Sequence, residues 1–411
     1  MLGLRRASLI AVLSAAAILA AACGTSTNNP SGGNATVPSD LSVTSFDASF
    51  SYMAKLKNLT SAGSGLVGVI LPDTTSSTRY VNFDAPYLKK AFDSAGYSSS
   101  NYKIDNAQGN PATEVSLAQA DITAGAKVLI FDPLDSNTGS QIQQLASSHG
   151  VKTISYDRAT FAGNNVYYVS FDNVQVGKLI GQGFLDCATA WGVSSAKVFT
   201  LDGGEDTDPN AVSFAQGYNS VVWNKTDSPL PAGTTNDKGM TLVGDKVAPG
   251  WDNAQGQTIF QQQFTANPSI NATIEANDGL GNAVITVLKN KGIAAKKVPT
   301  TGQDATEQGM ANVLEGFQCG SVYKAVYLEA QDAVALATVL RAGQTPPSAL
   351  LNGTTKPPSG QSGNQQPASL LVPIWVTTKN MNDTVIKDNF VDKTKLCTDA
   401  GQAACTAAGI S

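Results

Sequence analysis

The chain has 411 residues, of which 42% are hydrophobic and 14% are charged, and its formal net charge is −5. At roughly 100–200 residues per domain, this length predicts two or three domains, each able to bury a core. The acidic balance disfavours nucleic-acid binding, and the single histidine, His149, excludes paired-histidine metal sites and argues against a Ser/His/Asp triad.

The N-terminus has the features of an export signal. Arg5 and Arg6 precede an apolar run over residues 7–22, and small residues lead to Cys23. The run is shorter than the roughly 20 residues that span a bilayer, which argues against a membrane anchor. We therefore interpret residues 1–22 as a lipoprotein signal peptide and Cys23 as the lipidated first residue of the mature protein. Residues 23–63 are predicted to be a lipidated tether, rich in Ser, Thr, Asn, Gly and Pro up to residue 40, followed by a short helix.

Four further cysteines follow Cys23, namely Cys187, Cys319, Cys397 and Cys405. An exported protein can form disulfides, and four cysteines allow three pairings between which the sequence does not decide. The short spacing between Cys397 and Cys405 favours that pair. No CxxC motif is present, so neither a zinc site nor dithiol redox chemistry is supported.

From residue 64 onward, short apolar runs typical of buried strands alternate with segments that have helical spacing of apolar residues. Strands are predicted at 66–71, 127–131, 151–156, 166–171, 196–201, 241–245, 271–276, 297–301 and 321–327. Helices are predicted at 84–95, 139–147, 174–190, 211–223, 254–266, 279–292, 306–316 and 330–342. The alternation indicates an α/β fold with parallel sheets covered on both faces, and the number of units exceeds one open sheet. We therefore expect two doubly wound lobes.

Polar residues follow most of the predicted strands directly, which is where doubly wound sheets bind ligands. They are Asp73 with Arg79, Asp132 with Asp135, Asp157 with Arg158, Asp202 to Asn210, Asn277 with Asp278, and Gln303 with Asp304. Each alone is more often a helix cap or a turn residue. Together at one edge they favour a site that donates to and accepts from vicinal hydroxyls. Trp251, after a Pro-Gly pair, is either a flat wall for the C–H face of a sugar or a core residue.

Other kinds of site are not supported. Asp206, Asp208 and Asn210 match the first three positions of a calcium loop, but Ala211 and Gly217 occupy the positions of its turn glycine and bidentate glutamate. The chain has no glycine-rich phosphate loop and no carboxylate pair in a recognisable glycosidase context. We expect no metal, no cofactor and no enzymatic activity.

Five stretches, in order along the chain, carry a resemblance to a known family: 154–158 (ISYDR), 169–177 (VSFDNVQVG), 277–279 (NDG), 302–305 (GQDA) and 322–324 (VYK). Over roughly residues 64–345 the chain resembles the sugar-binding lipoproteins and periplasmic proteins that supply ABC importers and have the type 1 periplasmic-binding fold. The resemblance implies two α/β lobes joined by three crossovers. It places 64–160 and 305–350 in the first lobe and 161–304 and 369–411 in the second. Residues 351–368 belong to a stretch rich in Pro, Gly and Gln, and this composition predicts an exposed loop.

The resemblance also implies which side chains bind the ligand. They are Arg79, Tyr80, Asp135, Arg158, Asn210, Trp251, Asp278, Asp304 and Lys324. Arg158 and Asp278 are expected on different lobes, where they would meet through the sugar's hydroxyls. The implied ligand is a monosaccharide, D-xylose in the first place, with ribose, glucose, galactose or inositol as alternatives, because the 132–135 segment (DPLD) is closer to a ribose-type pattern.

The implied partners are this sugar, an ABC permease and the membrane that the lipid on Cys23 would enter. The protein itself is expected to lie outside the cytoplasm and to be a monomer. Three other roles are open at this point. The same receptor could serve a sensor or chemotaxis partner. A two-lobed transcription regulator would need an N-terminal pair of DNA-binding helices, where this chain has an export signal. A secreted glycosidase would be distinguished by sugar-release assays.

Overall fold

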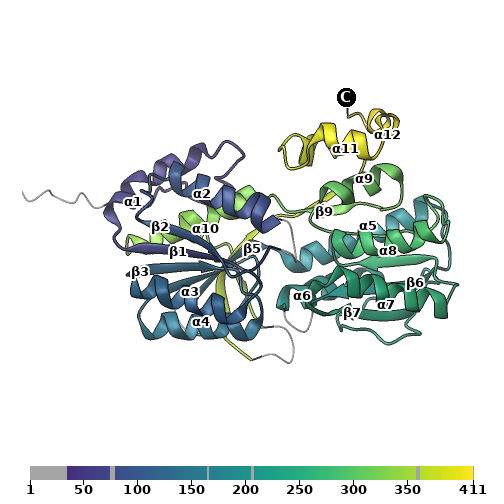
Figure 1. Ribbon diagram of the computed structural model, residues 1–411, viewed down its shortest axis with the longest axis horizontal. Coiled ribbons are helices and arrows are strands. Elements are labelled where there is room, and N and C mark those ends of the chain that lie inside the picture. The colour runs from purple at the N-terminus through teal and green to yellow at the C-terminus, as the bar shows by residue number, and fades with distance from the viewer. Residues whose placement is uncertain (1–34, 75–78, 164–165, 205–207, 358–361, 411) are drawn as a thin grey trace, which may run out of the picture. The chain divides into compact units, whose positions relative to one another are not determined.

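The computed structural model describes residues 35–410 except 75–78, 164–165, 205–207 and 358–361 (Figure 1). The predicted signal peptide and Cys23 lie outside the described residues. Within the described ranges, no helix combines the length and the apolar character that crossing a membrane requires.

Among the residues described, seven strands form the larger sheet, in the order β10-β11-β5-β4-β3-β1-β2. Their bounds are β1 Leu66–Leu71, β2 Tyr102–Asn106, β3 Ala126–Phe131, β4 Lys152–Tyr156, β5 Val166–Phe171, β10 Gly353–Thr355 and β11 Gln366–Leu371. Neighbouring strands pair in parallel except β10 with β11, which are antiparallel. Because helices cover both faces, the central strands are apolar on both sides, as buried parallel strands require.

The helices of this sheet lie on its two faces. They are α1 Lys57–Ala62, α2 Ala85–Ser94, α3 Pro111–Thr123, α4 Ser136–Ser148 and α10 Val326–Arg341, with the short turns η1 Ser51–Leu56 and η2 Tyr80–Asp84 before α1 and α2. On β3, Val128 and Ile130 join one apolar cluster, while Leu129 and Phe131 join another. This alternation shows that the strand separates two cores. We call this sheet with its helices the first lobe.

A second sheet has the order β7-β6-β8, with all neighbours parallel, and β9 pairs with β12 in a separate antiparallel pair. The strands are β6 Lys197–Gly203, β7 Thr241–Ala248, β8 Ala272–Glu275, β9 Ser321–Tyr323 and β12 Ile374–Val376. The helices are α5 Asn173–Ala190, α6 Pro209–Val222, α7 Asn253–Ala266, α8 Asp278–Asn290 and α9 Glu307–Glu315, with the turn η3 Pro249–Trp251. We call this group the second lobe. The C-terminal segment, residues 377–410, follows β12 and contains η4 Asn382–Ile386, α11 Lys393–Asp399 and α12 Gln402–Ala407.

The chain passes between the lobes three times, from β5 to α5, from β9 to α10 and from β11 to β12. The number of crossovers agrees with the expectation, but their positions differ from the expected lobe boundaries. Strand 166–171, expected in the second lobe, pairs with β4 and β11 in the first. Helix α9 and strand β9, expected in the first lobe, contact α8 and β12 of the second.

The expected exposed loop at 351–368 is only partly a loop. Residues 353–355 and 366–371 form β10 and β11, and Gln366 and Ala368 are buried. The backbone of β11 pairs with β5, so a long-range contact overrides a composition rich in Pro, Gly and Gln.

Two further expectations are corrected. Residues 297–301 are not a strand, and one reason is that Pro299 has no N–H group to donate to a neighbouring strand. In addition, side chains replace backbone hydrogen bonds of the ladder. Thr301 N donates to Glu275 Oε2 and Glu275 N donates to Thr301 Oγ1, each at 2.8 Å. The predicted strand at 321–327 ends at Tyr323, and α10 begins at Val326. β2 and α3 were not predicted.

The described part of the chain contains two disulfides. Cys397–Cys405 confirms the favoured pair, and Cys187–Cys319 joins α5 to the segment before β9 within the second lobe.

Candidate functional site

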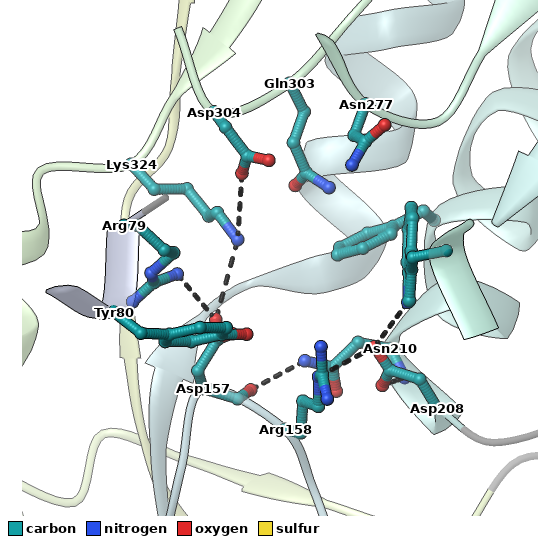
Figure 2. A pocket seen from close by; sticks show the side chains of 12 residues that line it. Arg79, Tyr80, Asp157, Arg158, Asp208, Asn210, Asn277, Gln303, Asp304 and Lys324 are labelled. Atoms are coloured by element: carbon teal, nitrogen blue, oxygen red, sulfur yellow. Dashed lines mark hydrogen bonds and ion pairs between the residues drawn. The ribbon is translucent and has the colours of Figure 1, made fainter. Parts of the chain in front are cut away.

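A cavity of about 40 Å³ lies where loops that follow strands of both lobes meet (Figure 2). One water molecule needs roughly 10–15 Å³ of cavity volume on the same scale, so the cavity suits one small ligand rather than a chain of sugar units. Twelve residues line it: Arg79, Tyr80, Asp157, Arg158, Asp208, Asn210, Phe214, Trp251, Asn277, Gln303, Asp304 and Lys324.

Arg79 forms the wall on the side of the first lobe, in a fixed orientation. Its guanidinium donates to Asp84 through Nε and Nη2 at 2.9 and 2.8 Å, to Asp157 through Nη1 at 2.8 Å and to Glu329 through Nη2 at 2.7 Å. Burial by itself would lower the pKa of Arg79, but these three carboxylates raise that pKa well above its usual value. Arg79 is therefore positioned before any ligand arrives.

Asp157 follows β4 and connects several parts of the site. Its carboxylate accepts from Arg79 and lies 3.5 Å from Lys324 Nζ, which is also 3.6 Å from Asp304. Burial alone would raise the pKa of Asp157, but Arg79, Lys324 and Arg158 lower it below its usual value, so this carboxylate is ionised. Its backbone has φ 57°, a left-handed conformation that aspartate adopts more readily than most residues.

Asn210, near the start of α6, forms hydrogen bonds from the second lobe to the first. Its Nδ2 donates to the carbonyl oxygen of Asp157 at 2.6 Å, and its Oδ1 accepts from Tyr168 Oη at 3.2 Å. Asp208 caps α6 through the N–H of Asn210 and lies 3.6 Å from Arg158 Nε. In this arrangement the lobes are closed on each other around the cavity.

Aromatic rings form the wall on the side of the second lobe. Trp251 lies against Gly203 and Gly204, where a Cβ atom on either residue would collide with its ring, so only glycine allows the ring to approach this backbone. Trp251 Nε1 donates to Asp208 Oδ2 at 3.2 Å. Phe214, on α6, meets the Trp251 ring edge-on, with 6.3 Å between centroids. A flat apolar ring beside polar groups suits the C–H face of a sugar.

The cations around the cavity are already paired with carboxylates. The cations are Arg79, Arg158 and Lys324, and the carboxylates are Asp157, Asp208 and Asp304. Each of these cations already pairs with at least two carboxylates, so a buried anionic ligand would find no cation that needs a partner, which is unfavourable. The arrangement therefore favours a neutral, hydroxyl-rich ligand over a sugar acid or a sugar phosphate.

The structure brings seven of the nine predicted binding residues to the cavity: Arg79, Tyr80, Arg158, Asn210, Trp251, Asp304 and Lys324. Asp135 does not line it, because its carboxylate caps α4 through the N–H groups of Asn137 and Thr138 at 2.8 and 2.9 Å.

Asp278 does not line the cavity either, so the expected meeting of Arg158 and Asp278 through a sugar lacks a geometric basis here. The carboxylate of Asp278 is fully buried and accepts from Thr306 N and Oγ1, Gln318 Nε2 and Ser321 Oγ at 2.7–3.0 Å. Its burial raises the pKa of Asp278 to about 7. Its neighbour Asn277 lines the cavity instead.

Five lining residues were not among the nine. Asp157, Asp208, Asn277 and Gln303 belong to the wider set of polar residues after predicted strands, so the strand-end rule could have found them. Phe214 lies inside helix α6, where a phenylalanine gives no signal beyond that of an ordinary core residue.

Two lobes with parallel sheets, three crossovers and a cavity between the strand ends define a two-lobed binding protein. The chain belongs to the periplasmic binding protein domain family, whose model matches residues 67–345. The proteins that it resembles are binding proteins rather than enzymes, as expected from the sequence.

Relatives and solved structures agree with this assignment. The D-xylose-binding periplasmic protein of Escherichia coli is 31% identical over 295 residues, which are 71% of this chain and 82% of that protein. The multiple sugar-binding periplasmic protein of Azospirillum brasilense is 30% identical over 335 residues, 79% of this chain and 89% of that protein. A carbohydrate transporter solute-binding protein from Chloroflexus aurantiacus, solved with D-glucose, has a TM-score of 0.67 and 25% identity, and the match covers 81% of this chain and 98% of that one.

Proposed function

We propose that this protein is an extracytoplasmic receptor that binds one monosaccharide between its lobes and delivers it to an ABC importer. The observation that carries the proposal is the cavity between the lobes, in which amide groups and paired carboxylates and cations lie beside an aromatic wall. Such groups can pair with every hydroxyl of a small neutral sugar, while Trp251 covers an apolar face. The names of the relatives, which are sugar-binding proteins of this family, support the same class of ligand.

D-Xylose is the first sugar to test. The support is the relative in Escherichia coli, named for D-xylose, together with the seven lining residues that the resemblance implied. D-Glucose is the second candidate, since the Chloroflexus aurantiacus protein was solved with it and is 25% identical.

A panel of D-xylose, D-ribose, D-glucose, D-galactose and myo-inositol, tested by thermal shift and then by calorimetry, examines the proposal. A ligand at about 100 times its dissociation constant adds roughly 2.7 kcal/mol to the unfolding free energy, which is readily visible as a higher melting temperature. A flat response to all five compounds, with D-xylose 1-phosphate or a sugar acid binding instead, would contradict the assignment to neutral sugars.

Attachment to the membrane through Cys23 is a separate part of the proposal, supported by the apolar run before this residue. A lipid anchor would raise the local concentration of the receptor near its permease. Cys23→Ala should move the protein to the soluble fraction, with Ser31→Ala, farther along the predicted tether, as a control that keeps Cys23. Membrane retention of the Cys23 variant would contradict the anchor without affecting the sugar-binding proposal.

A further inference from the structure

The C-terminal segment contacts both lobes. It leaves β12 in the second lobe, and its α11 packs against α9 of the same lobe (Figure 1). Asp392 N also donates to Glu307 Oε2, at the start of α9, at 3.3 Å. Met381 and Leu396 are fully buried, so the segment is packed in place rather than a loose tail.

Phe390 makes the aromatic contact between this segment and the first lobe. Its ring stacks on that of Phe83, with 4.2 Å between centroids and 18° between planes. Phe83 lies in the turn η2, directly before α2, and stacks in turn on Tyr87 at 6.1 Å. A side chain of the C-terminal segment therefore extends an aromatic stack of the first lobe.

The same segment is attached at a crossover. Tyr323 and Tyr327 lie on either side of the passage from β9 to α10, and both hydroxyls donate to Asp388 Oδ2 at 3.0 Å. Asp388 is two residues before Phe390. Residues at the crossover and on α9 therefore hold the segment on both sides of Phe390.

Phe390 also covers a gap between the lobes. A cavity of about 130 Å³ lies beneath it, with walls from the first lobe and from the second: Arg79, Asn82, Phe83, Asp304, Ala305, Thr306, Glu307 and Phe390. Arg79 and Asp304 line the ligand cavity as well. A rotation that opens the ligand cavity would move Phe83 away from the wall formed by Thr306 and Glu307, and with it from Phe390.

We infer that the C-terminal segment is a latch that favours the closed arrangement of the lobes through the stack of Phe390 on Phe83. The inference rests on the proposed function for its functional consequence, which is that a latch on the closed form slows the release of the bound sugar. The latch itself is a property of the ligand-free protein as well. In energetic terms, a contact made only in the closed form shifts the opening equilibrium by the strength of that contact.

The test compares Phe390→Leu, Phe83→Leu and the double variant. The control is Phe264→Leu, which removes a stack on Phe260 at 5.4 Å inside α7 of the second lobe. Small-angle X-ray scattering of the ligand-free proteins should give a larger radius of gyration for each single variant and an unchanged one for the control. The double variant should match the single variants, because both members of one stack have been removed.

Stopped-flow measurement of D-xylose release should show dissociation roughly 2- to 12-fold faster in the single variants, the range expected for an aromatic pair. Single variants that fold, as judged by circular dichroism, and match the parent in radius of gyration overturn the latch. Effects of the two substitutions that add up in the double variant also overturn it. If no tested sugar binds, the proposed function fails, while the scattering measurement still decides the latch.

Discussion

Two aspartates of the second lobe, Asp304 and Asp278, allow a direct test of which predicted carboxylates bind the ligand. Both follow predicted strands and both were expected to bind the ligand. Asp304 lines the cavity 3.6 Å from Lys324, whereas Asp278 is buried behind it and accepts four hydrogen bonds from protein groups. Asp304→Asn and Asp278→Asn are the same isosteric change, so they differ only in the surroundings of the carboxylate.

Asp304→Asn should weaken sugar binding by roughly 10- to 150-fold. This range corresponds to the 1.5–3 kcal/mol of a hydrogen bond to a charged group. Lys324 keeps its second partner, Asp157, so the folded protein loses little and its melting temperature should change by no more than a few degrees.

Asp278→Asn should show the opposite result. Its amide nitrogen would face donors such as Thr306 N or Ser321 Oγ, so about 1–3 kcal/mol of stability should be lost. Sugar affinity should stay within about threefold of the parent, since Asp278 does not reach the cavity. Calorimetric titration and thermal unfolding of both variants decide the matter. An Asp278 variant that folds normally and loses affinity as strongly as the Asp304 variant would refute this reasoning.

Three further outcomes follow from the same structure. Burial raises the pKa of Asp332 to about 7 from 3.8, so the folded state favours the protonated form and stability falls as the pH rises between these two values. Asp332→Asn should therefore stabilise the protein at pH 8, by up to about 4 kcal/mol, and much less at pH 4, as measured by chemical denaturation. Cys187→Ser with Cys319→Ser removes a bridge with a sequence separation of 132 and should lower the unfolding free energy by about 2–5 kcal/mol, while the same change at Cys397 and Cys405, separated by 8, should cost less. Trp251→Leu should weaken sugar binding about tenfold or more in calorimetry, with affinity close to that of the parent counting against the aromatic wall.

The sequence predicted the strands that carry a continuous apolar run and missed strands that carry none. Strands such as β1 and β3 are covered on both faces, so their apolar runs are visible in the sequence. The edge strand β2 is only partly buried and has the mixed sequence YKIDN, so it carries no comparable pattern. β11 exists because its backbone pairs with β5, and pairing over such a separation leaves no local mark.

The site was predictable to the extent that it follows from strand ends. Parallel strands direct their carboxyl ends to one edge, so a polar residue after a strand is a candidate wherever the fold is recognised. The rule cannot separate a ligand-facing carboxylate from a cap, which is why Asp135 was included with Asp304. The difference depends on donors that come from elsewhere in the chain, as the partners of Asp278 at 306, 318 and 321 illustrate.

Asp157 connects the chemistry of the site with the movement of the lobes. Its side chain is fixed by Arg79 of the first lobe and by Lys324 at a crossover, while its carbonyl oxygen accepts from Asn210 of the second lobe at 2.6 Å. Opening of the lobes must lengthen the hydrogen bond from Asn210, but it leaves the pairs of the Asp157 carboxylate with Arg79 and Lys324 in place. The first lobe can therefore keep its charged groups arranged while the second lobe moves. The groups that change partners on closure are then the amide of Asn210 and the pair of Arg158 with Asp208 at 3.6 Å. Arg158 keeps Asp132 at 3.9 Å as a partner within the first lobe, so opening leaves no buried cation without a carboxylate, which would be costly.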